Sequence, residues 1–414
     1  MKEPLIQNDA IIFGILMLML AFVFTTASSN STFWKKFYGV VPTLLMCYFL
    51  PSLLSSFGLI NPEESRLYFM ASRYLLPACL VLLTISVDMK ELVKLGPKAL
   101  IMFMTGTLGI MFGGPIAILL FSFIAPDVIS APAPNEVWRG FTTVAGSWIG
   151  GGANQAAMKE VFEVSDSIFS KVVAVDIIVG NMWLAILMIG IGRNAWINQK
   201  LKADDNSIKT LKKKMADFQQ RVARIPSTTD FFKVLGVGFA CVAVGHAVAG
   251  VLAPFIGENY PALKDYSLDS NFFWVVVTAT TLGVILSFTK ARELEGAGAS
   301  RIGSVFIYVL VATIGMNMDI LAIFDNPGLF LVGLVWISFH ALLMFLVARL
   351  IKAPYFFIAV GSQANVGGAA SAPVVASYFH PSLAPVGVLL AVVGYAVGTY
   401  GALLCGYMMA GVSP

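Results

Sequence analysis

Hydrophobic residues occur along this chain in long runs that are separated by short polar stretches. A helix needs about 20 predominantly apolar residues to cross a bilayer. The stretch 100–123 exceeds that length without a single charged residue. The pattern predicts an all-α polytopic membrane protein with twelve apolar segments, at about 9–27, 37–60, 67–87, 98–125, 139–162, 168–192, 231–256, 271–289, 303–324, 328–351, 355–379 and 383–412.

The composition agrees with a lipid bilayer as the surroundings. Hydrophobic residues make up 58% of the chain and charged residues 12%, whereas soluble domains carry about 25% charge. The four cysteines lie in apolar runs without CxxC spacing, so we expect neither a disulfide framework nor a metal site. Much of the net charge of +4 lies in 193–230. This segment is expected to be a cytoplasmic linker, and the charge does not indicate nucleic-acid binding.

The two halves of the chain resemble each other. The sequence LTISVDM at 83–89 matches ATIGMNM at 312–318, which pairs Thr84 with Thr313 and Asp88 with Asn317. Further on, GSWIGGGANQAA begins at Gly146, and GSQANVGGAASAP begins at Gly361. Because the same kinds of sequence feature occur in the same order in four consecutive segments of each half, we expect an internal duplication.

Lysine and arginine positions indicate how the halves are oriented. If segment 139–162 crossed the membrane fully, Lys35, Lys36, Lys90, Lys94 and Lys98 would face away from the cytoplasmic linker, against the positive-inside rule. A segment that returns to its own side places them inside. The sequence therefore predicts an inverted repeat, with five transmembrane helices plus one re-entrant or broken helix in each half and both termini outside. Whether 139–162 and 355–379 are hairpins or crossed broken helices stays open.

The two glycine-rich breaks are the expected binding site. Broken backbone at membrane depth is tolerated only where it is buried in protein or lines a water-filled cavity. Free N–H groups there suit anions, and carbonyl and amide oxygens suit cations such as Na⁺. Na⁺ is expected at Asn154, Gln155, Gln363 and Asn365. Close helix packing by small residues is the alternative. The substrate- or ion-binding residues are predicted to be Ser147, Gly150, Gly151, Gly152, Asn154, Gln155, Asp176, Asn181, Thr313, Asn317, Ser362, Gln363, Asn365, Gly367, Gly368 and Ser371.

Two other classes of protein are less well supported. An intramembrane hydrolase would use Ser147 with His246 or His340, but no third orienting group is recognisable. The lone histidines are instead expected to be packing residues. An ion channel would need a symmetric ring of ligands around a pore. We therefore expect a transporter, with no catalytic residue and no cofactor besides a coupling ion. Na⁺ is favoured over H⁺ because the breaks are rich in neutral oxygen ligands.

The twelve segments with these two glycine motifs resemble the YjcL-like family of bacterial membrane proteins, a domain-of-unknown-function family. More distantly, the plan is similar to the sodium/glutamate, sodium/citrate and bile-acid/sodium symporters. That resemblance implies a homodimer in the bacterial inner membrane and an elevator mechanism. By this analogy 1–62 and 231–300 form the scaffold, and 63–192 and 301–414 form the transport domain. The second break has no arginine, which favours an amino acid, short peptide or monocarboxylate over di- and tricarboxylates.

Overall fold

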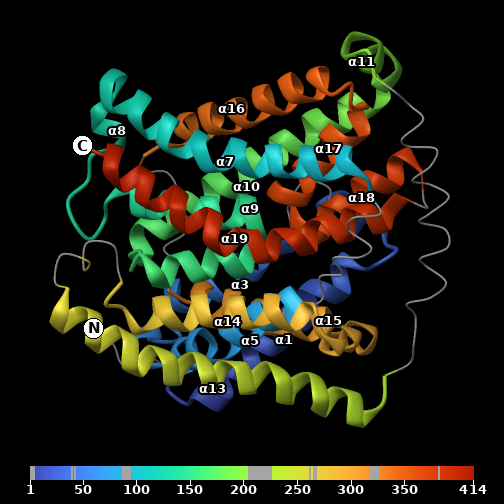
Figure 1. Ribbon diagram of the computed structural model, residues 1–414. Coiled ribbons are helices and arrows are strands. Elements are labelled where there is room, and N and C mark those ends of the chain that lie inside the picture. Colours follow the sequence, from blue (N-terminus) through green and yellow to red (C-terminus); the bar gives the residue numbers. More distant parts are fainter. Residues whose placement is uncertain are drawn as a thin grey trace.

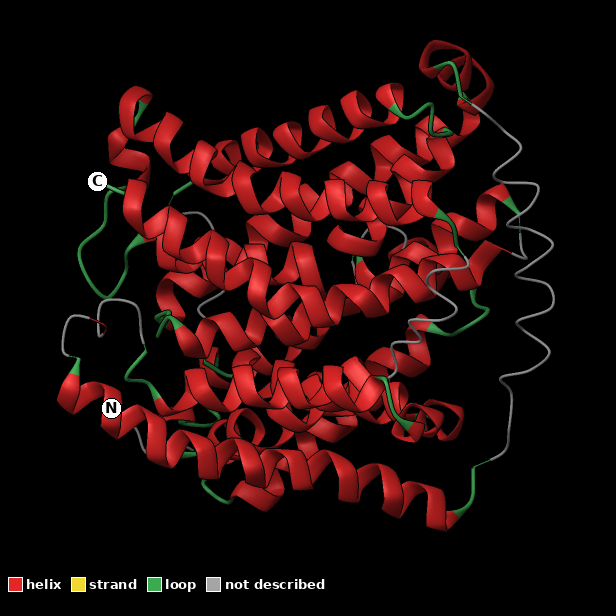
Figure 2. Ribbon diagram, in the orientation of Figure 1, coloured by secondary structure: helices red, strands yellow, loops and turns green. Residues whose placement is uncertain are grey.

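All regular structure in the described part of the chain is helical (Figure 2). The computed structural model describes residues 5–38, 41, 43–85, 95–203, 226–260, 263, 268–317, 326–380 and 383–414. Asp88, Lys90 and Lys94 and most of the predicted linker lie outside these ranges. Among the described residues, eight helices are long and apolar enough to cross a membrane. The prediction of an all-α polytopic membrane protein is confirmed.

The long helices correspond to predicted apolar segments. A continuous span is formed by α4 (Leu67–Met70), the π-helix Ala71–Leu75 and α5 (Leu76–Ile85). The other seven are α1 (Asp9–Ala27), α7 (Pro97–Ile124), α10 (Asp166–Gly192), α13 (Thr228–Asn259), α15 (Ala299–Gly315), α16 (Gly328–Leu350) and α19 (Ala384–Val412).

The remaining segments are shorter or broken. Helix α14 (Asn271–Ser287) is followed at an angle of 96° by a 3-10 helix, Lys290–Ala297. The two glycine-rich segments form α9 (Val137–Val161) and the pair α17 (Tyr355–Val366) and α18 (Gly368–Phe379). The short helices are α2 (Thr32–Tyr38), α3 (Thr43–Ser56), α8 (Pro126–Ile129), α11 (Asn194–Leu201) and the 3-10 helix Pro62–Glu64.

Polar side chains define where several spans begin. Asn8 accepts hydrogen bonds from two backbone N–H groups of α1, and Ser165 accepts one at the start of α10. Ser227 and Asp230 form a reciprocal capping box at the start of α13. Such caps satisfy N–H groups that have no acceptor within the helix. These caps pair some of the N–H groups at the starts of α1, α10 and α13, and water can pair the others where the helix ends lie at the membrane boundary.

The helices form two layers (Figure 1). The lower layer contains α1, α3, α5, α13, α14 and α15, and its main contacts are between α13 and α14, α14 and α5, and α15 and α5. The upper layer contains α7, α9, α10, α16, α17, α18 and α19, and its main contacts are between α19 and α9 and between α16 and α7. Helices α5 and α15 thus pack in the lower layer. The sequence-based assignment of 63–192 and 301–414 to one moving domain stays a prediction.

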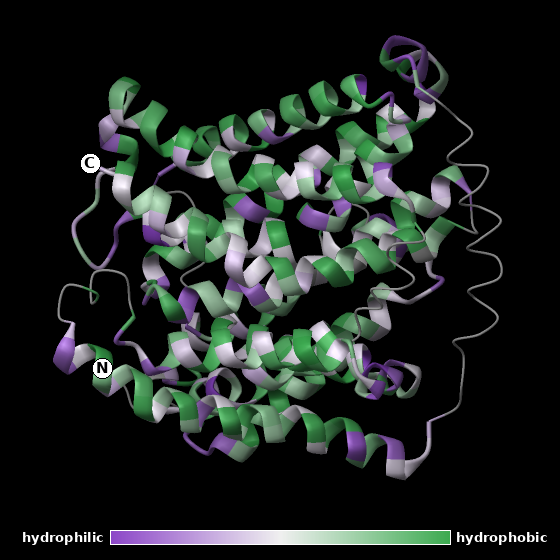
Figure 3. Cartoon of the chain, in the orientation of Figure 1, coloured by the Kyte–Doolittle hydropathy of each residue, from purple (hydrophilic) through white to green (hydrophobic). Residues whose placement is uncertain are grey.

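Hydrophobic residues predominate along the outer helices of the molecule (Figure 3). Leu18, Val251 and Leu342 are 72%, 69% and 68% exposed on three different helices. A monomeric soluble protein rarely exposes so much apolar surface. This surface fits the hydrocarbon of a bilayer, which is the environment that the composition predicts.

Both chain ends lie at one end of the helix bundle, and α11 and the start of α13 lie at the opposite end (Figure 1). This arrangement agrees with an odd number of crossings between the N-terminus and α11. Which end faces the cytoplasm stays a prediction from the basic residues.

Candidate functional site

Helix α9 reverses its direction at Gly151, whose φ and ψ are 74° and −174°. The Arg139 guanidinium donates a hydrogen bond of 2.9 Å to the Phe162 carbonyl, which joins the two ends of the segment. A Cβ on Gly146 would lie 2.5 Å from the Asn154 carbonyl oxygen. In an unbroken helix, residues eight apart are separated by about 12 Å. The segment is therefore a helical hairpin, called hairpin 1 below.

Helices α17 and α18 form a second helical hairpin, hairpin 2. Gly368, at the break, has a φ of 57°, a conformation that favours glycine. The rings of Phe356 and Phe379, near the two open ends, have centroids 5.2 Å apart. Both glycine-rich segments are thus hairpins, which resolves the choice that the sequence left open.

The hairpins enter from opposite ends of the bundle. Phe162, at the open end of hairpin 1, packs against Tyr407 near the C-terminus of α19. Tyr355, at the open end of hairpin 2, donates its backbone N–H to the Asn198 side chain on α11. Figure 1 places the C-terminus and α11 at opposite ends. An inverted repeat requires this arrangement, although the repeat relationship itself stays a prediction.

The two tips meet at Gly394 in α19. A Cβ on this glycine would lie 2.8 Å from the Ile149 carbonyl oxygen of hairpin 1 and 3.4 Å from the Ala364 carbonyl oxygen of hairpin 2. Gly180 in α10 approaches both tips as well, because its Cβ would lie 3.9 Å from Trp148 and 3.7 Å from Val366. Glycine at these positions allows the tips to converge in the middle of the upper layer.

Asn154 fastens the tip of hairpin 1 to α19. Its Nδ2 donates to the carbonyl oxygens of Gly150 and Tyr395, at 3.0 and 3.2 Å. Its Oδ1 accepts a hydrogen bond of 2.6 Å from the Thr399 hydroxyl. These bonds use both amide hydrogens and leave one lone pair on Oδ1.

Asn365 fastens the tip of hairpin 2 to α7 in the same way. Its Nδ2 donates to the carbonyl oxygens of Gly361 and Phe103, both at 3.0 Å. Its Oδ1 accepts from the Thr107 hydroxyl at 2.8 Å. In both cases the partner helix supplies a carbonyl and, four residues later, a threonine. The predicted ion-binding role of the two asparagines therefore depends on the remaining lone pair of each Oδ1.

Asp176 binds both arms of hairpin 1 from α10 and is 5% exposed. Its Oδ1 accepts from Trp148 Nε1 at 2.6 Å, and its Oδ2 accepts from Gln155 Nε2 at 2.8 Å. Ser147 lies next to the same carboxylate. Tyr48 of α3, in the lower layer, donates its hydroxyl to Gln155 Oε1 at 3.2 Å. Two predicted residues of hairpin 1, Ser147 and Gln155, thus lie beside one buried carboxylate at the boundary between the layers.

Ser362 of hairpin 2 belongs to a chain of hydrogen bonds. Its hydroxyl accepts from Trp183 Nε1 at 2.7 Å and lies 2.8 Å from His340 Nε2. His340 Nδ1 lies 3.0 Å from the Gly106 carbonyl oxygen. Because a carbonyl can only accept, Nδ1 carries the hydrogen and Nε2 accepts from Ser362. His340, expected from the sequence to be a packing residue, therefore orients a predicted site residue.

The other predicted residues are placed less centrally. Asn181 donates to Ile177 within α10, Thr313 donates to Leu310, and Asn317 donates to Thr313. Gln363 and Ser371 are hydrogen-bonded to each other across hairpin 2. The sequence did not indicate Tyr48, Trp148, Trp183, Thr107 and Thr399. Each is a single polar residue within an apolar helix, and the sequence does not show which residue of another helix it contacts.

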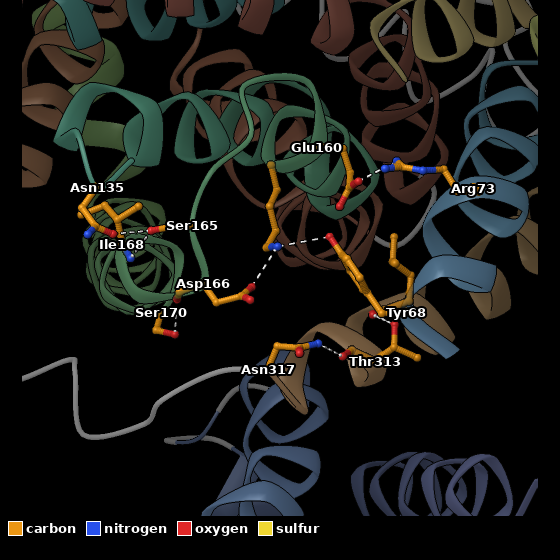
Figure 4. A network of polar contacts seen from close by, with 12 residues as sticks. Tyr68, Arg73, Asn135, Glu160, Ser165, Asp166, Ile168, Ser170, Thr313 and Asn317 are labelled. Atoms are coloured by element: carbon orange, nitrogen blue, oxygen red, sulfur yellow. Dashed lines mark hydrogen bonds and ion pairs between the residues drawn. The ribbon is translucent and has the colours of Figure 1, made fainter. Parts of the chain in front are cut away.

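Polar side chains also join hairpin 1 to the lower layer (Figure 4). Arg73, in the π-helix, lies with Nη1 2.6 Å from Glu160 Oε2. Lys159 Nζ donates to the Tyr68 hydroxyl at 3.1 Å and lies 2.9 Å from Asp166 Oδ1. Lys159 is 7% exposed, so its charge is held between these partners. A π-turn leaves carbonyls without their usual partners, and His246 of α13 lies 3.0 Å from the Arg73 carbonyl oxygen.

Comparison with known proteins finds relatives whose activity is not described. Residues 14–412, which include both hairpins, match the family described as protein of unknown function, DUF819. The uncharacterized membrane protein YjcL of Bacillus subtilis (strain 168) is 27% identical over 359 residues, which cover 82% of this chain and 83% of that protein. These findings confirm the resemblance that the glycine motifs indicated.

Proposed function

The chain belongs to the DUF819 family of proteins of unknown function, and we propose from the geometry of its site that it is a secondary active transporter. Its cargo is a small polar organic solute of the amino acid, short peptide or monocarboxylate class. Transport is coupled to Na⁺ or H⁺. The protein acts in the bacterial inner membrane, with 193–230 in the cytoplasm.

The observation that supports this proposal is the convergence of two hairpin tips on Gly394 in the middle of the bundle. Each tip interrupts the helical hydrogen bonding, so backbone groups become available to a solute or ion. A buried carboxylate, Asp176, is bonded to one of the tips. An ionisable group within a membrane span is a functional-site hypothesis by default, because its burial is costly.

Asp176 is the proposed coupling residue. Trp148 Nε1 and Gln155 Nε2 can only donate, so both carboxylate oxygens act as acceptors. This arrangement stabilises a negative charge that a Na⁺ ion or a proton neutralises during the cycle. Because the same two donors belong to the two arms of hairpin 1, neutralising Asp176 loosens the tip. Ion binding is thereby coupled to movement of the hairpin.

An elevator movement of one layer against the other is the proposed mechanism. Both hairpins, Asp176 and the helices that fasten the tips all lie in the upper layer. The contacts across the boundary include Tyr48 to Gln155 and Arg73 to Glu160. The upper layer moves as a unit, and the lower layer forms the scaffold and the homodimer contact. This proposal differs from the sequence-based boundaries because it assigns α5 and α15 to the scaffold.

Transport in proteoliposomes tests the function. Uptake from a labelled metabolite panel should saturate and should depend on an inward Na⁺ or H⁺ gradient. Asp176→Asn should remove the gradient dependence, whereas Asp127→Asn, at an exposed position on α8, should not. Uptake that does not saturate and ignores both gradients supports an ion channel instead. Labelling of Ser362 by a serine-directed fluorophosphonate supports a hydrolase, because Ser362 lies beside His340.

A further inference from the structure

Gln363 lies near the tip of hairpin 2 with one half of its side-chain amide unpaired. Its Oε1 accepts a hydrogen bond of 2.7 Å from the Ser371 hydroxyl on the other arm. Its Nε2 is buried and has no hydrogen-bond partner among the described residues, and the side chain is 1% exposed. A buried donor without an acceptor destabilises the folded protein. Gln363 Nε2 therefore needs a hydrogen-bond acceptor that the described residues do not supply.

The unpaired donor lies at the start of α18. A Cβ on Gly367, the residue before this helix, would collide with both Gln363 Oε1 and Ser371 Oγ. The amide therefore lies against the backbone of the break, and Nε2 is bonded to the same carbon as Oε1. No side chain caps the first turn of α18, which is a helix of 12 residues. The N–H groups of a first turn have no acceptor within the helix, and they carry a partial positive charge.

We propose that Gln363 Nε2 and the first-turn N–H groups of α18 bind one carboxylate group of the transported solute. This inference rests on the proposed function and narrows its substrate class. The oxygens of the carboxylate accept from the amide and from the backbone, so the buried donor gains its partner. The Ser371 hydroxyl holds Oε1 and thereby turns Nε2 towards the ligand.

The charge of hairpin 2 favours a single carboxylate. Residues 355–379 contain no lysine, arginine or histidine. The positive end of a helix is equivalent to about half an elementary charge, which suits one negative group. Asp176 and the Ile149 carbonyl oxygen near Gly394 add negative potential on the side of hairpin 1. A solute that places a carboxylate at hairpin 2 and a polar or cationic group towards Asp176 fits both tips.

Thermal unfolding of the purified full-length protein in detergent tests this site. Sodium acetate should raise the apparent Tm above sodium chloride at equal ionic strength, because a ligand of the folded state stabilises it. Acetamide, the neutral isostere, should not. Gln363→Glu removes the amide hydrogens whichever way the amide is turned, and it adds a negative charge. It should shift the midpoint of the acetate titration at least tenfold. Gln199→Glu, at an exposed position on α11, is the matched control and should respond as the unchanged protein does.

The outcomes separate this inference from the proposed function. If Gln363→Glu does not fold, Gln363→Met removes the donor without adding a charge and should lose the acetate response as well. An equal acetate response in the unchanged protein and in the Gln363 variants overturns the inference, as does a response no larger than that to chloride. Because binding in detergent needs no gradient, an acetate response without flux in proteoliposomes overturns only the transport proposal. If the protein transports a solute in proteoliposomes but Gln363→Glu responds to acetate as the unchanged protein does, only the carboxylate site is overturned.

Discussion

Arg73 and Glu160 form an ion pair across the boundary between the two layers, with Nη1 and Oε2 2.6 Å apart. The guanidinium carbon of Arg73 also lies 4.4 Å from the centre of the Phe272 ring of α14. Arg73 is therefore fixed to the lower layer, and Glu160 belongs to hairpin 1. Any sliding of one layer over the other must break this contact.

Arg73→Ala should lower the free energy of unfolding by about 1.5–3 kcal/mol, the range for a hydrogen bond to a charged group. The side chain of Glu160 is 9% exposed and would lose its partner. Thermal unfolding in detergent measures the change. The exchange variant Arg73→Glu with Glu160→Arg should recover part of the loss. Glu163→Gln, at an exposed position, is the control, and equal destabilisation by this variant contradicts the prediction.

Gly394→Ala should abolish coupled uptake. The added methyl group would lie 2.8 Å from the Ile149 carbonyl oxygen, so the tips would be forced apart. Gly411→Ala in the same helix is the matched control, because a Cβ there meets nothing within 4 Å. Initial uptake rates of the two variants, each compared with its amount of folded protein, give the result. Normal uptake by Gly394→Ala would show that the spacing of the tips is not needed.

Asn154→Ala should destabilise the protein as well as stop uptake. The variant removes the hydrogen bonds that Asn154 makes with two groups of α19, the Tyr395 carbonyl and the Thr399 hydroxyl, and each lost hydrogen bond costs about 0.5–1.5 kcal/mol. Adding Thr399→Val removes one of these groups and should restore part of the stability. A double-variant cycle in thermal unfolding checks this coupling. Strictly additive effects would mean that Asn154 and Thr399 act independently.

Cysteine labelling should place Arg139 and Lys171 on the same membrane face and Lys200 on the other. Hairpin 1 separates the first two positions without crossing, whereas α10 separates Lys171 from Lys200. Single cysteines at these positions, in a background without the four native cysteines, are treated with a membrane-impermeant maleimide. Labelling of Arg139 and Lys171 from opposite faces would contradict a re-entrant hairpin.

The spans and the breaks were predictable from the sequence because each depends on local composition. An apolar run such as 98–125 predicts a membrane span from its own composition. The glycines at 150–152 and 367–368 weaken a helix wherever they occur. The sequence also indicated Ser147 and Gln155, which lie beside a break and next to Asp176, but it did not indicate Trp148. These inferences needed no knowledge of which helices are neighbours.

The partners of the tips were not predictable, because they depend on which helices meet. Thr399 and Thr107 look like ordinary small residues of apolar spans until Asn154 and Asn365 are placed opposite them. His340 was expected to be a packing residue, because the sequence does not show that the helix of His340 lies beside the helix of Ser362. The packing of α5 in the lower layer likewise follows from three-dimensional contacts with α14 and not from the pattern of α5 itself.

The fastening of the tips interlocks the two halves of the polypeptide. The first half contributes hairpin 1, which is held by α19 of the second half, and the second half contributes hairpin 2, which is held by α7 of the first. Neither half can therefore complete its own tip before the other has inserted. Biogenesis must end with a mutual closure of the halves, and a ribosome that stops after α11 releases a chain whose Asn154 still lacks Thr399.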